Sequence, residues 1–240
     1  MKRREDAYGQ MHVAALDGRS SLGTIERDDG FFEVSGVDQH FAPFRRWPAC
    51  ERQGMRFVRG RVLDVGCGAG RACLHLQERG CDVVGIDNSP GAVEVSRRRG
   101  VRDARVRALE EIGPSLGSFD TILMYGNNLG LLGSPRRARR ILERLHELTS
   151  DEGRIVGSTL DPYSTDDPAH LAYHERNRRR GRPRGQVRIR VRYRDLVTPW
   201  FDLLWTSTAE LEAIVDGTGW RLTRTLGDSA VYVAVIDKCG

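Results

Sequence analysis

The stretch RVLDVGCGAGRA, from Arg61 to Ala72, places Gly66, Gly68 and Gly70 at alternate positions directly after a short apolar run. Glycine loses the most conformational freedom on folding, so three together indicate a demanding backbone path or a ligand that approaches the backbone closely. An apolar run, a glycine loop and a helix form the turn of an open α/β sheet where nucleotides bind against backbone amides. The stretch therefore predicts a nucleotide-type ligand at this turn.

From residue 61 onward the sequence alternates between strand and helix patterns. Short apolar runs predict strands at 61–66, 81–87, 104–110, 119–126 and 153–161. Helices are predicted at 70–80, at 89–100 with Ser89 as the N-cap, from Ser134 onward, and after a capping box formed by Ser207 and Glu210. Runs at 220–226 and 231–238, joined by GDSA, predict a closing antiparallel pair. This alternation is typical of an α/β domain with a mostly parallel sheet.

Two parts of the chain stand outside this alternation. Residues 1–60 are predicted to form a cap, with a helix over 5–17 and a hairpin at 23–35 that turns at Asp29 and Gly30. The alternating strands and helices are predicted to form the main domain at 61–240, which carries an insertion at about 162–205. In that insertion VRIRVRY (187–193) alternates strictly, so it predicts a half-buried strand that pairs with WFDLLW (200–205) as a lid. The stretch 176–185 is predicted to be a loop.

Composition excludes several classes of protein. The 240 residues are 39% hydrophobic and 30% charged, as in an ordinary globular protein. No run approaches the roughly 18 apolar residues of a membrane span, so we expect no membrane association. The N-terminus MKRREDAYGQMH lacks the apolar core of a signal peptide, which predicts a cytoplasmic protein. The five cysteines have neither metal-ligand nor disulfide spacing, so we expect reduced thiols and no metal site.

The net charge of +5 includes a segment, 176–194, that holds ten arginines and no acidic residue. Such a segment can bind a phosphate, a carboxylate or a nucleic-acid backbone. The whole chain, however, has 36 arginines and 2 lysines, so arginine richness alone carries little information. Arg188, Arg190 and Arg192 share one face of the predicted strand. An anion site and an edge strand protected by charge both remain open, and we favour the second.

Two ligand classes compete for the glycine loop. A dinucleotide fingerprint needs a third glycine where this chain has Arg71. The chain instead has Asp64 inside the strand end and Asp87 at the end of the second strand. A carboxylate at that place can accept both hydroxyls of a ribose, each bond contributing roughly 1.5–3 kcal/mol. The pattern favours a nucleoside cofactor over a dinucleotide.

LDVGCGAGR, VVGIDNS and FDTILMYGNN, in this order and spacing, resemble the class I S-adenosylmethionine-dependent methyltransferases, of the bacterial small-molecule type. The resemblance implies a Rossmann-like, seven-stranded, mostly parallel sheet with an antiparallel last strand. It implies S-adenosyl-L-methionine as cofactor and S-adenosyl-L-homocysteine as product. It assigns cofactor binding to Asp64, Gly66, Cys67, Gly68, Gly70, Asp87, Asn88, Ala108, Leu109, Glu110 and Tyr125. Many relatives have an acidic residue in place of Ala108, so adenine recognition here is expected to rest on backbone and apolar contacts.

Candidates for the reaction itself lie in three segments. Asn127 and Asn128 in YGNNLGLLG follow the fourth strand, where methyltransferases resembling this one present their substrate, and they are our catalytic candidates. An equal alternative is that these asparagines only form hydrogen bonds with the backbone of their own loop. The substrate candidates are Tyr8 and Met11 on the N-terminal helix and Tyr163, His170 and His174 in the insertion. His170 and His174, one helical turn apart, also suit a solvated helix face, which we favour over a metal pair.

We therefore predict a methyltransferase that transfers a methyl group by in-line displacement to a small-molecule acceptor. Apolar and aromatic residues of the cap and lid suit a closed pocket, namely Phe31, Phe32, Phe41, Phe44, Trp47, Trp200 and Trp205. The alternatives are an RNA or other anionic-substrate methyltransferase that uses the arginine-rich hairpin, and a non-catalytic protein that binds S-adenosylmethionine. The sequence leaves open whether oxygen, nitrogen, sulfur or carbon is methylated. It also leaves the oligomeric state open, with a homodimer among the alternatives.

Overall fold

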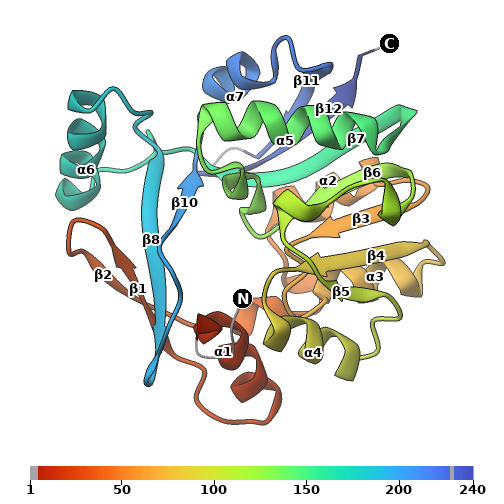
Figure 1. The fold of residues 1–240 in the computed structure, drawn as a ribbon, viewed down its shortest axis with the longest axis horizontal. Helices are drawn as coiled ribbons and strands as arrows, with labels where there is room; N and C mark the ends of the chain where they lie inside the picture. The colour runs from red at the N-terminus through yellow and green to blue at the C-terminus, as the bar shows by residue number, and fades with distance from the viewer. Residues whose placement is uncertain (1–4, 228–229, 240) are drawn as a thin grey trace.

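A seven-stranded sheet forms the centre of the protein in the computed structural model, which describes residues 5–227 and 230–239 (Figure 1). Its strand order is β11-β12-β7-β6-β3-β4-β5, and of these seven strands β12 alone runs in the opposite direction to the others. The strands are β3 (Val62–Val65), β4 (Val83–Asp87), β5 (Ala104–Val106), β6 (Phe119–Met124), β7 (Thr149–Leu160), β11 (Trp220–Leu226) and β12 (Val231–Lys238). The predicted Rossmann-like fold with an antiparallel last strand is confirmed. Residues 228–229 of the predicted GDSA connection lie outside the described residues.

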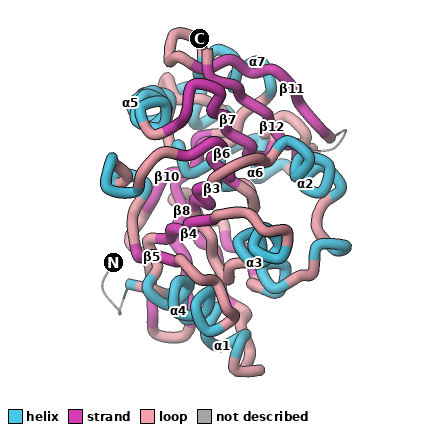
Figure 2. The backbone as a smooth tube through the Cα atoms, turned by 90° about the vertical axis from the view of Figure 1, so that its right-hand side faces the viewer, coloured by secondary structure: helices cyan, strands magenta, loops and turns pink. Residues whose placement is uncertain are grey.

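Helices cover both faces of this sheet (Figure 2). Side chains of α5 (Pro135–Glu147) and α7 (Thr208–Val215) pack in one apolar cluster, and those of α2 (Ala49–Gly54), α3 (Arg71–Glu78) and α4 (Pro90–Arg98) pack in another. The predicted caps are confirmed, because Ser89 and Ser134 each accept a backbone bond from their helix and Ser207 forms the capping box with Glu210. The strand predicted at 104–110 is wrong in its second half, because the chain turns into a 3-10 helix at Leu109–Glu111.

A second, five-stranded sheet joins the N-terminal segment to the insertion. Its order is β10-β8-β1-β2, with β9 also paired to β8. The strands are β1 (Gly23–Arg27), β2 (Phe32–Ser35), β8 (Gln186–Tyr193), β9 (Leu196–Val197) and β10 (Phe201–Leu204). The predicted pairing of 187–193 with 200–205 is present as β8–β10, and β1 adds antiparallel to the other edge of β8, with Ile25 opposite Val191. The cap hairpin and the lid hairpin, which are predicted as two separate units, thus share one sheet.

Two helices pack against β8. Ala7 and Met11 of α1 (Ala7–Leu16) contact a cluster with Val191 and Tyr193, and Tyr173 of α6 (Pro168–Arg179) clusters with Val187 and Ile189 farther along the strand. In Figure 1, α1 also lies beside α4 of the main sheet, and the two helices are in contact.

The loop predicted at 176–185 is wrong in its first part, because α6 continues to Arg179. Asp167 caps the start of this helix, and the buried amide of Asn177 donates to the carbonyls of Arg184 and Gln186 just beyond its end. Within the two described ranges, none of the helices has the length and apolarity needed to cross a membrane.

Candidate cofactor and acceptor site

The glycine loop between β3 and α3 has a left-handed backbone at each alternate position. Gly66, Gly68 and Gly70 have φ angles of 72°, 54° and 77°. A Cβ on Gly66 would lie 2.5 Å from the side-chain nitrogen of Asn128, and a Cβ on Gly70 would lie 2.5 Å from Val101 Cγ2. A Cβ on Gly68 would meet nothing closer than an imidazole nitrogen of His12, at 3.6 Å. Packing therefore demands glycine at Gly66 and Gly70, while at Gly68 the backbone conformation is the constraint.

Asp87 lies across this loop at the carboxyl end of β4. Its two carboxylate oxygens accept hydrogen bonds from the amide of Gly68 at 3.0 Å and from the amide of Ser89 at 2.9 Å. Burial raises the pKa of Asp87 to about 6, against the opposing effect of those amide bonds. Asn88, which lies between Asp87 and Ser89 in the sequence, is exposed. The carboxylate is thus held at the rim of the glycine loop by the backbone itself.

Asp64 lies beneath the loop in β3 and is almost fully buried. It accepts a hydrogen bond from the thiol of Cys73 at 3.1 Å, and burial raises its pKa to about 6. The predicted cofactor residue Cys67 is also buried, and its amide donates to the carbonyl of Ile86 at 3.0 Å. These two side chains support the loop from the sheet side.

The helices that follow the loop and Asp87 differ at their N-termini. Ser89 and Asp6 cap α4, because Ala92 donates its amide to Ser89 Oγ and Gly91 donates its amide to Asp6. The N-cap of α3 is Gly70, which has no side chain to offer. The first amides of a helix have no partner within the helix, so those of α3 remain available for an anionic group beside the loop.

The loop after β6 faces the glycine loop from the other side. The side-chain amide of Asn128 donates to the carbonyls of Val65 and Gly66, both at 2.9 Å. Asn127 has a left-handed backbone with φ of 63°, and its amide donates to Ser158 Oγ. The structure thus brings Asn128 onto the glycine loop, where its two amide hydrogens are bound to backbone oxygens.

Glu51 joins these two loops and is a residue that sequence reasoning missed. Its carboxylate forms a 2.6 Å ion pair with Arg71 and accepts hydrogen bonds from the amide of Gly126 and the hydroxyl of Ser158. Its backbone carbonyl accepts a bond from the hydroxyl of Tyr125. No sequence pattern relates α2 to residues 71, 126 and 158, so only the fold reveals this link.

The remaining predicted cofactor residues follow β5. Leu109 is buried in the main cluster, while Ala108 is partly exposed and its amide donates to Glu111. Glu110 is exposed and forms an ion pair with Arg137. The stretch 108–110 therefore leads from Ala108 into a 3-10 helix and is not a strand edge.

Tyr8 lies over the glycine loop with two histidines that sequence reasoning did not single out. His12 Nε2 is 2.8 Å from His40 Nδ1, and the Tyr8 hydroxyl is 3.3 Å from His40 Nε2. The imidazoles of His12 and His40 are also the two side chains nearest to a Cβ placed on Gly68. The spacing of Tyr8 and His12, one helical turn apart, was a visible signal, whereas His40 lies in a distant 3-10 turn. Met11, by contrast, is fully buried against β8.

The other three substrate candidates lie in or beside the insertion. Tyr163 is half exposed and donates to Glu210 at 2.8 Å. His170 packs edge-on against the ring of Phe31, and His174 is buried in α6, where burial lowers its pKa. Their contacts lie with α6, α7 and the β1–β2 turn, so the structure does not bring them together with Tyr8.

The arginine stripe of β8, defined as Arg188, Arg190 and Arg192, is matched by carboxylates. Glu26 on the neighbouring strand binds Arg190 through two bonds of 2.6 and 2.8 Å and also binds Arg192 at 2.5 Å. Hydrogen bonds, the largest from Arg190, hold the pKa of Glu26 down at about 2. Arg188 lies 3.6 Å from Asp202. Each arginine of the stripe thus already has an anionic partner.

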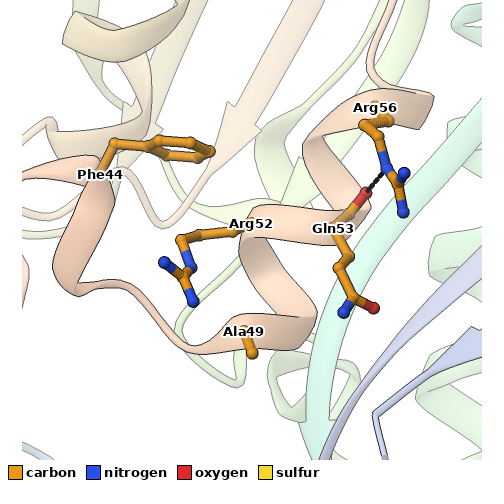
Figure 3. Close-up of a pocket in the computed structure, with 5 residues that line it drawn as sticks. All are labelled: Phe44, Ala49, Arg52, Gln53 and Arg56. Carbon is orange, nitrogen blue, oxygen red and sulfur yellow. Dashed lines mark hydrogen bonds between the residues drawn. The ribbon is translucent and has the colours of Figure 1, made fainter.

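A separate open depression of about 470 Å³ lies along α2 (Figure 3). Figure 3 shows Arg52, Gln53 and Arg56 projecting from the helix, with Arg56 donating to the carbonyl of Gln53 at 3.4 Å. Phe44 and Ala49 complete its lining. Phe44 is also one of the aromatic residues expected to close the acceptor pocket, but none of the predicted cofactor, catalytic or substrate residues lines this depression, which is distinct from the glycine-loop site.

Comparison with known proteins gives a consistent result. A family profile described as a methyltransferase domain matches residues 62–153. The chain is 31% identical over 117 residues to the ubiquinone biosynthesis O-methyltransferase of Azorhizobium caulinodans, an alignment that covers 46% of this chain and 45% of that protein. It is 36% identical over 67 residues to the magnesium-protoporphyrin O-methyltransferase of Rhodobacter capsulatus, covering 26% of this chain and 30% of that protein. The chain thus spans about half, or less, of the length of the curated relatives it matches.

A solved structure matches over the whole chain. It is a SAM-dependent methyltransferase from Bacteroides fragilis in complex with S-adenosyl-L-homocysteine, with a TM-score of 0.84, 26% identity, and coverage of 100% of this chain and 98% of that one. The matched region includes the sheet, the glycine loop and the second sheet. Residues 62–153 thus form a methyltransferase domain, and the whole chain resembles the class I S-adenosylmethionine-dependent methyltransferases, a family that uses S-adenosylmethionine as its methyl donor.

Proposed function

We propose that this chain is an enzyme that transfers the methyl group of S-adenosylmethionine to a small-molecule acceptor. One observation carries the proposal: Asp87 and the Gly68 amide meet at 3.0 Å at the carboxyl edge of the sheet, so a carboxylate and a glycine backbone border one site. An open α/β sheet binds its ligand at this edge. The full-length likeness to a methyltransferase that holds S-adenosyl-L-homocysteine supports the same conclusion.

The residues present fit the cofactor. Asp87 would accept the ribose hydroxyls, with Asn88 beside it, and the first amides of α3 would meet the carboxylate of the methionine part. The backbone of Gly66, Cys67, Gly68 and Gly70 would follow the cofactor, with Asp64 beneath it. Ala108, Leu109 and Glu110 would lie along the adenine chiefly through their backbone, since the side chain of Leu109 is buried in the main cluster. Tyr125 would border the methionine part.

On the acceptor side, the proposed chemistry depends on alignment. When bound, the cofactor supplies an electrophilic methyl group on a sulfonium. The chain's own residues hold the two loops in place: Asn128 joins the loop after β6 to Gly66, and Glu51 joins that loop to Arg71. Accurate alignment can lower a bimolecular barrier by roughly 7–11 kcal/mol. Asn127 and Asn128 thus act in this proposal by positioning, since both amide hydrogens of Asn128 are engaged.

The charge pairing of the arginine stripe favours a small molecule over RNA. A phosphate backbone would have to replace Glu26 and Asp202 as partners of Arg188, Arg190 and Arg192. The names of the curated relatives, which include ubiquinone biosynthesis and magnesium-protoporphyrin O-methyltransferases, also support a small acceptor.

The test combines binding with turnover. Calorimetry should detect binding of S-adenosylhomocysteine, and NAD should not bind with comparable strength. Incubation with [methyl-13C]-S-adenosylmethionine and a small-molecule extract of the source cells should yield a labelled product and S-adenosylhomocysteine in equal amounts. Cofactor binding without any labelled product would favour a non-catalytic binding protein and would refute the proposed function.

A further inference from the structure

Arg71, the first residue of α3, has a guanidinium group that is largely enclosed by the chain but only partly hydrogen-bonded. Its side chain is 12% exposed, and its one hydrogen-bond partner among the described residues is Glu51, which accepts from Nη2 at 2.6 Å. A guanidinium group has five N–H donors, so most of those of Arg71 find no acceptor on the described part of the chain. The missing acceptors must therefore come from water or from a ligand.

Two neighbours fix the direction of this guanidinium group. The carboxylate of Glu51 is itself held in place, because it also accepts hydrogen bonds from the Gly126 amide and the Ser158 hydroxyl. On another side, the guanidinium carbon lies 4.6 Å from the centre of the buried ring of Trp47. A charged group that is already ordered loses less conformational entropy when it binds a ligand, so Arg71 is preorganised for an anion.

Unfilled space lies beside the guanidinium group. A Cβ placed on Gly126 would have Arg71 Nη2, at 3.9 Å, as its one neighbour within 4 Å on the described chain, apart from the adjoining residues. A Cβ on Gly66 or Gly70, by contrast, would lie 2.5 Å from another side chain. Gly126 follows β6 and Arg71 follows the glycine loop, so this space lies at the carboxyl edge of the sheet, where an α/β fold binds its ligand.

The donors that border this space suit a carboxylate. Side chains of a helix lean toward its N-terminus, so the guanidinium group of Arg71 lies on the same side as the unpaired first amides of α3. A guanidinium group matches a carboxylate in shape and can bind it through two parallel hydrogen bonds. The carboxylate of the methionine part is the one anionic group of S-adenosylmethionine.

We propose that Arg71 is a binding residue for the carboxylate of the methionine part of S-adenosylmethionine, with Glu51 and Trp47 as positioning residues that hold its guanidinium group. This inference rests on the proposed function and names a cationic residue for one end of the cofactor. It also gives a role to a departure in the sequence, since Arg71 stands where a dinucleotide fingerprint has its third glycine.

The proposed contact links cofactor binding to the loop after β6. One oxygen of the Glu51 carboxylate accepts from Arg71, and the other accepts from the amide of Gly126. A cofactor carboxylate that holds Arg71 against Glu51 thereby also favours the observed position of Gly126. The loop that is proposed to present the acceptor is thus connected to the amino-acid end of the cofactor through two side chains.

Two ligands that differ in this carboxylate provide the test. Decarboxylated S-adenosylhomocysteine retains the nucleoside, the sulfur and the amine, so calorimetry of the wild type should show that it binds more weakly than S-adenosylhomocysteine. Arg71→Lys keeps a positive charge beside Glu51 but loses the planar pair of donors. It should weaken S-adenosylhomocysteine binding by about tenfold or more and decarboxylated ligand binding by less than about threefold.

A matched control and a second variant separate binding from positioning. Arg79→Gln removes an exposed positive charge at the C-cap of the same helix, so it should leave both affinities unchanged. Glu51→Asp keeps the negative charge but withdraws it from the guanidinium group by one methylene. It should reduce the preference for S-adenosylhomocysteine over the decarboxylated ligand, which a purely structural role of Glu51 would not change.

A measurement on the wild type keeps the inference testable even if these variants fail to fold. The 1H–15N resonance of Arg71 Nε, assigned through its own backbone, should shift when S-adenosylhomocysteine binds. It should stay close to its free position when the decarboxylated ligand binds. A response of equal size to both ligands would overturn the inference.

The remaining outcomes are equally decisive. Equal losses of affinity for both ligands in Arg71→Lys would show that Arg71 only supports the loop. Unchanged affinity for both ligands with a raised acceptor KM would assign Arg71 to an anionic acceptor. Either result would overturn the inference and leave the proposed function intact, whereas a wild type that binds neither ligand would refute the proposed function itself.

Discussion

Glu51 and Arg71 form a buried ion pair of 2.6 Å that joins α2 to the first residue of α3. The side chains are only 2% and 12% exposed, and Arg71 also lies over the ring of Trp47. Glu51 has further bonds to Gly126 and Ser158, so it satisfies donors from three parts of the main domain at once. The N-terminal segment is thereby part of the machinery that holds both loops of the site.

Glu51→Gln should destabilise the protein strongly, because it leaves Arg71 buried without its counter-charge. Removing one member of a buried pair typically costs about 3–5 kcal/mol, and urea unfolding at pH 7 would measure it. Glu152→Gln is the matched control, since Glu152 is 83% exposed beside Arg59 and such pairs contribute under about 1 kcal/mol. Equal, small effects of both substitutions would show that the Glu51 pair adds no stability.

Asp87 should make cofactor affinity depend on pH. Its pKa is raised to about 6, so the carboxylate is charged above that pH and protonated below it. The charged form accepts hydroxyl bonds better, so the affinity for S-adenosylhomocysteine should fall as the pH decreases from 8 to 5. Asp87→Ala should weaken binding by about one to two decades at pH 8, for a loss of roughly 1.5–3 kcal/mol.

Calorimetry across this pH range gives the check. The Asp87→Asn variant should lack the decrease, because an amide does not titrate. A decrease of the same size in Asp87→Asn would assign the pH dependence to another group, such as Asp64, whose pKa is also raised to about 6.

The strands and helices of the main sheet could be predicted from the sequence, because each depends on residues that are close together in the chain. The strand at 62–65, its glycine loop and the caps at Ser89, Ser134 and Ser207 each depend on neighbours within a few residues. The pairing of Thr24 with Arg192 is different, because it joins residues that are 168 positions apart. Each strand can be predicted from its own residues, but neither sequence indicates that the other is its partner. The alternation of apolar and polar residues predicts a strand but does not indicate which other strand it pairs with.

The candidate site also contains residues that local sequence patterns predict and residues that only the fold reveals. Asp87 and the three glycines are contiguous with the strands that carry them, so their places could be predicted. Glu51 and His40 have no motif, because their roles come from partners brought near by the fold, Arg71 and His12. Met11 illustrates the converse: an apolar residue on a predicted helix face does not reveal whether that face meets a ligand or, as here, another strand.

The arginine stripe offers a third prediction. Changing Arg188, Arg190 and Arg192 to glutamine should destabilise the protein by roughly 1–3 kcal/mol, because Glu26 is only 12% exposed and loses both of its cationic partners. Acceptor affinity should stay within a few-fold. Steady-state kinetics and urea unfolding of the triple variant provide the measurement. A tenfold or larger loss of acceptor affinity with cofactor affinity intact, or salt-sensitive RNA binding by the wild type, would instead assign an anionic substrate to this stripe.

Gly91 provides the last prediction, because α1 approaches α4 at this residue. A Cβ on Gly91 would lie 2.8 Å from the backbone carbon of Gly9, so Gly91→Ala should push α1 away from α4. Alanine favours the helix by up to about 1 kcal/mol over glycine, whereas overpacking costs roughly 1–3 kcal/mol, so the net stability change should be small. The displacement should nevertheless move Tyr8 from Gly68 and accelerate proteolysis within residues 5–17, with a clear loss of turnover. Gly113→Ala is the control, since nothing lies within 4 Å of its added Cβ. Full activity together with wild-type protease resistance in Gly91→Ala would show that the position of α1 does not govern the site.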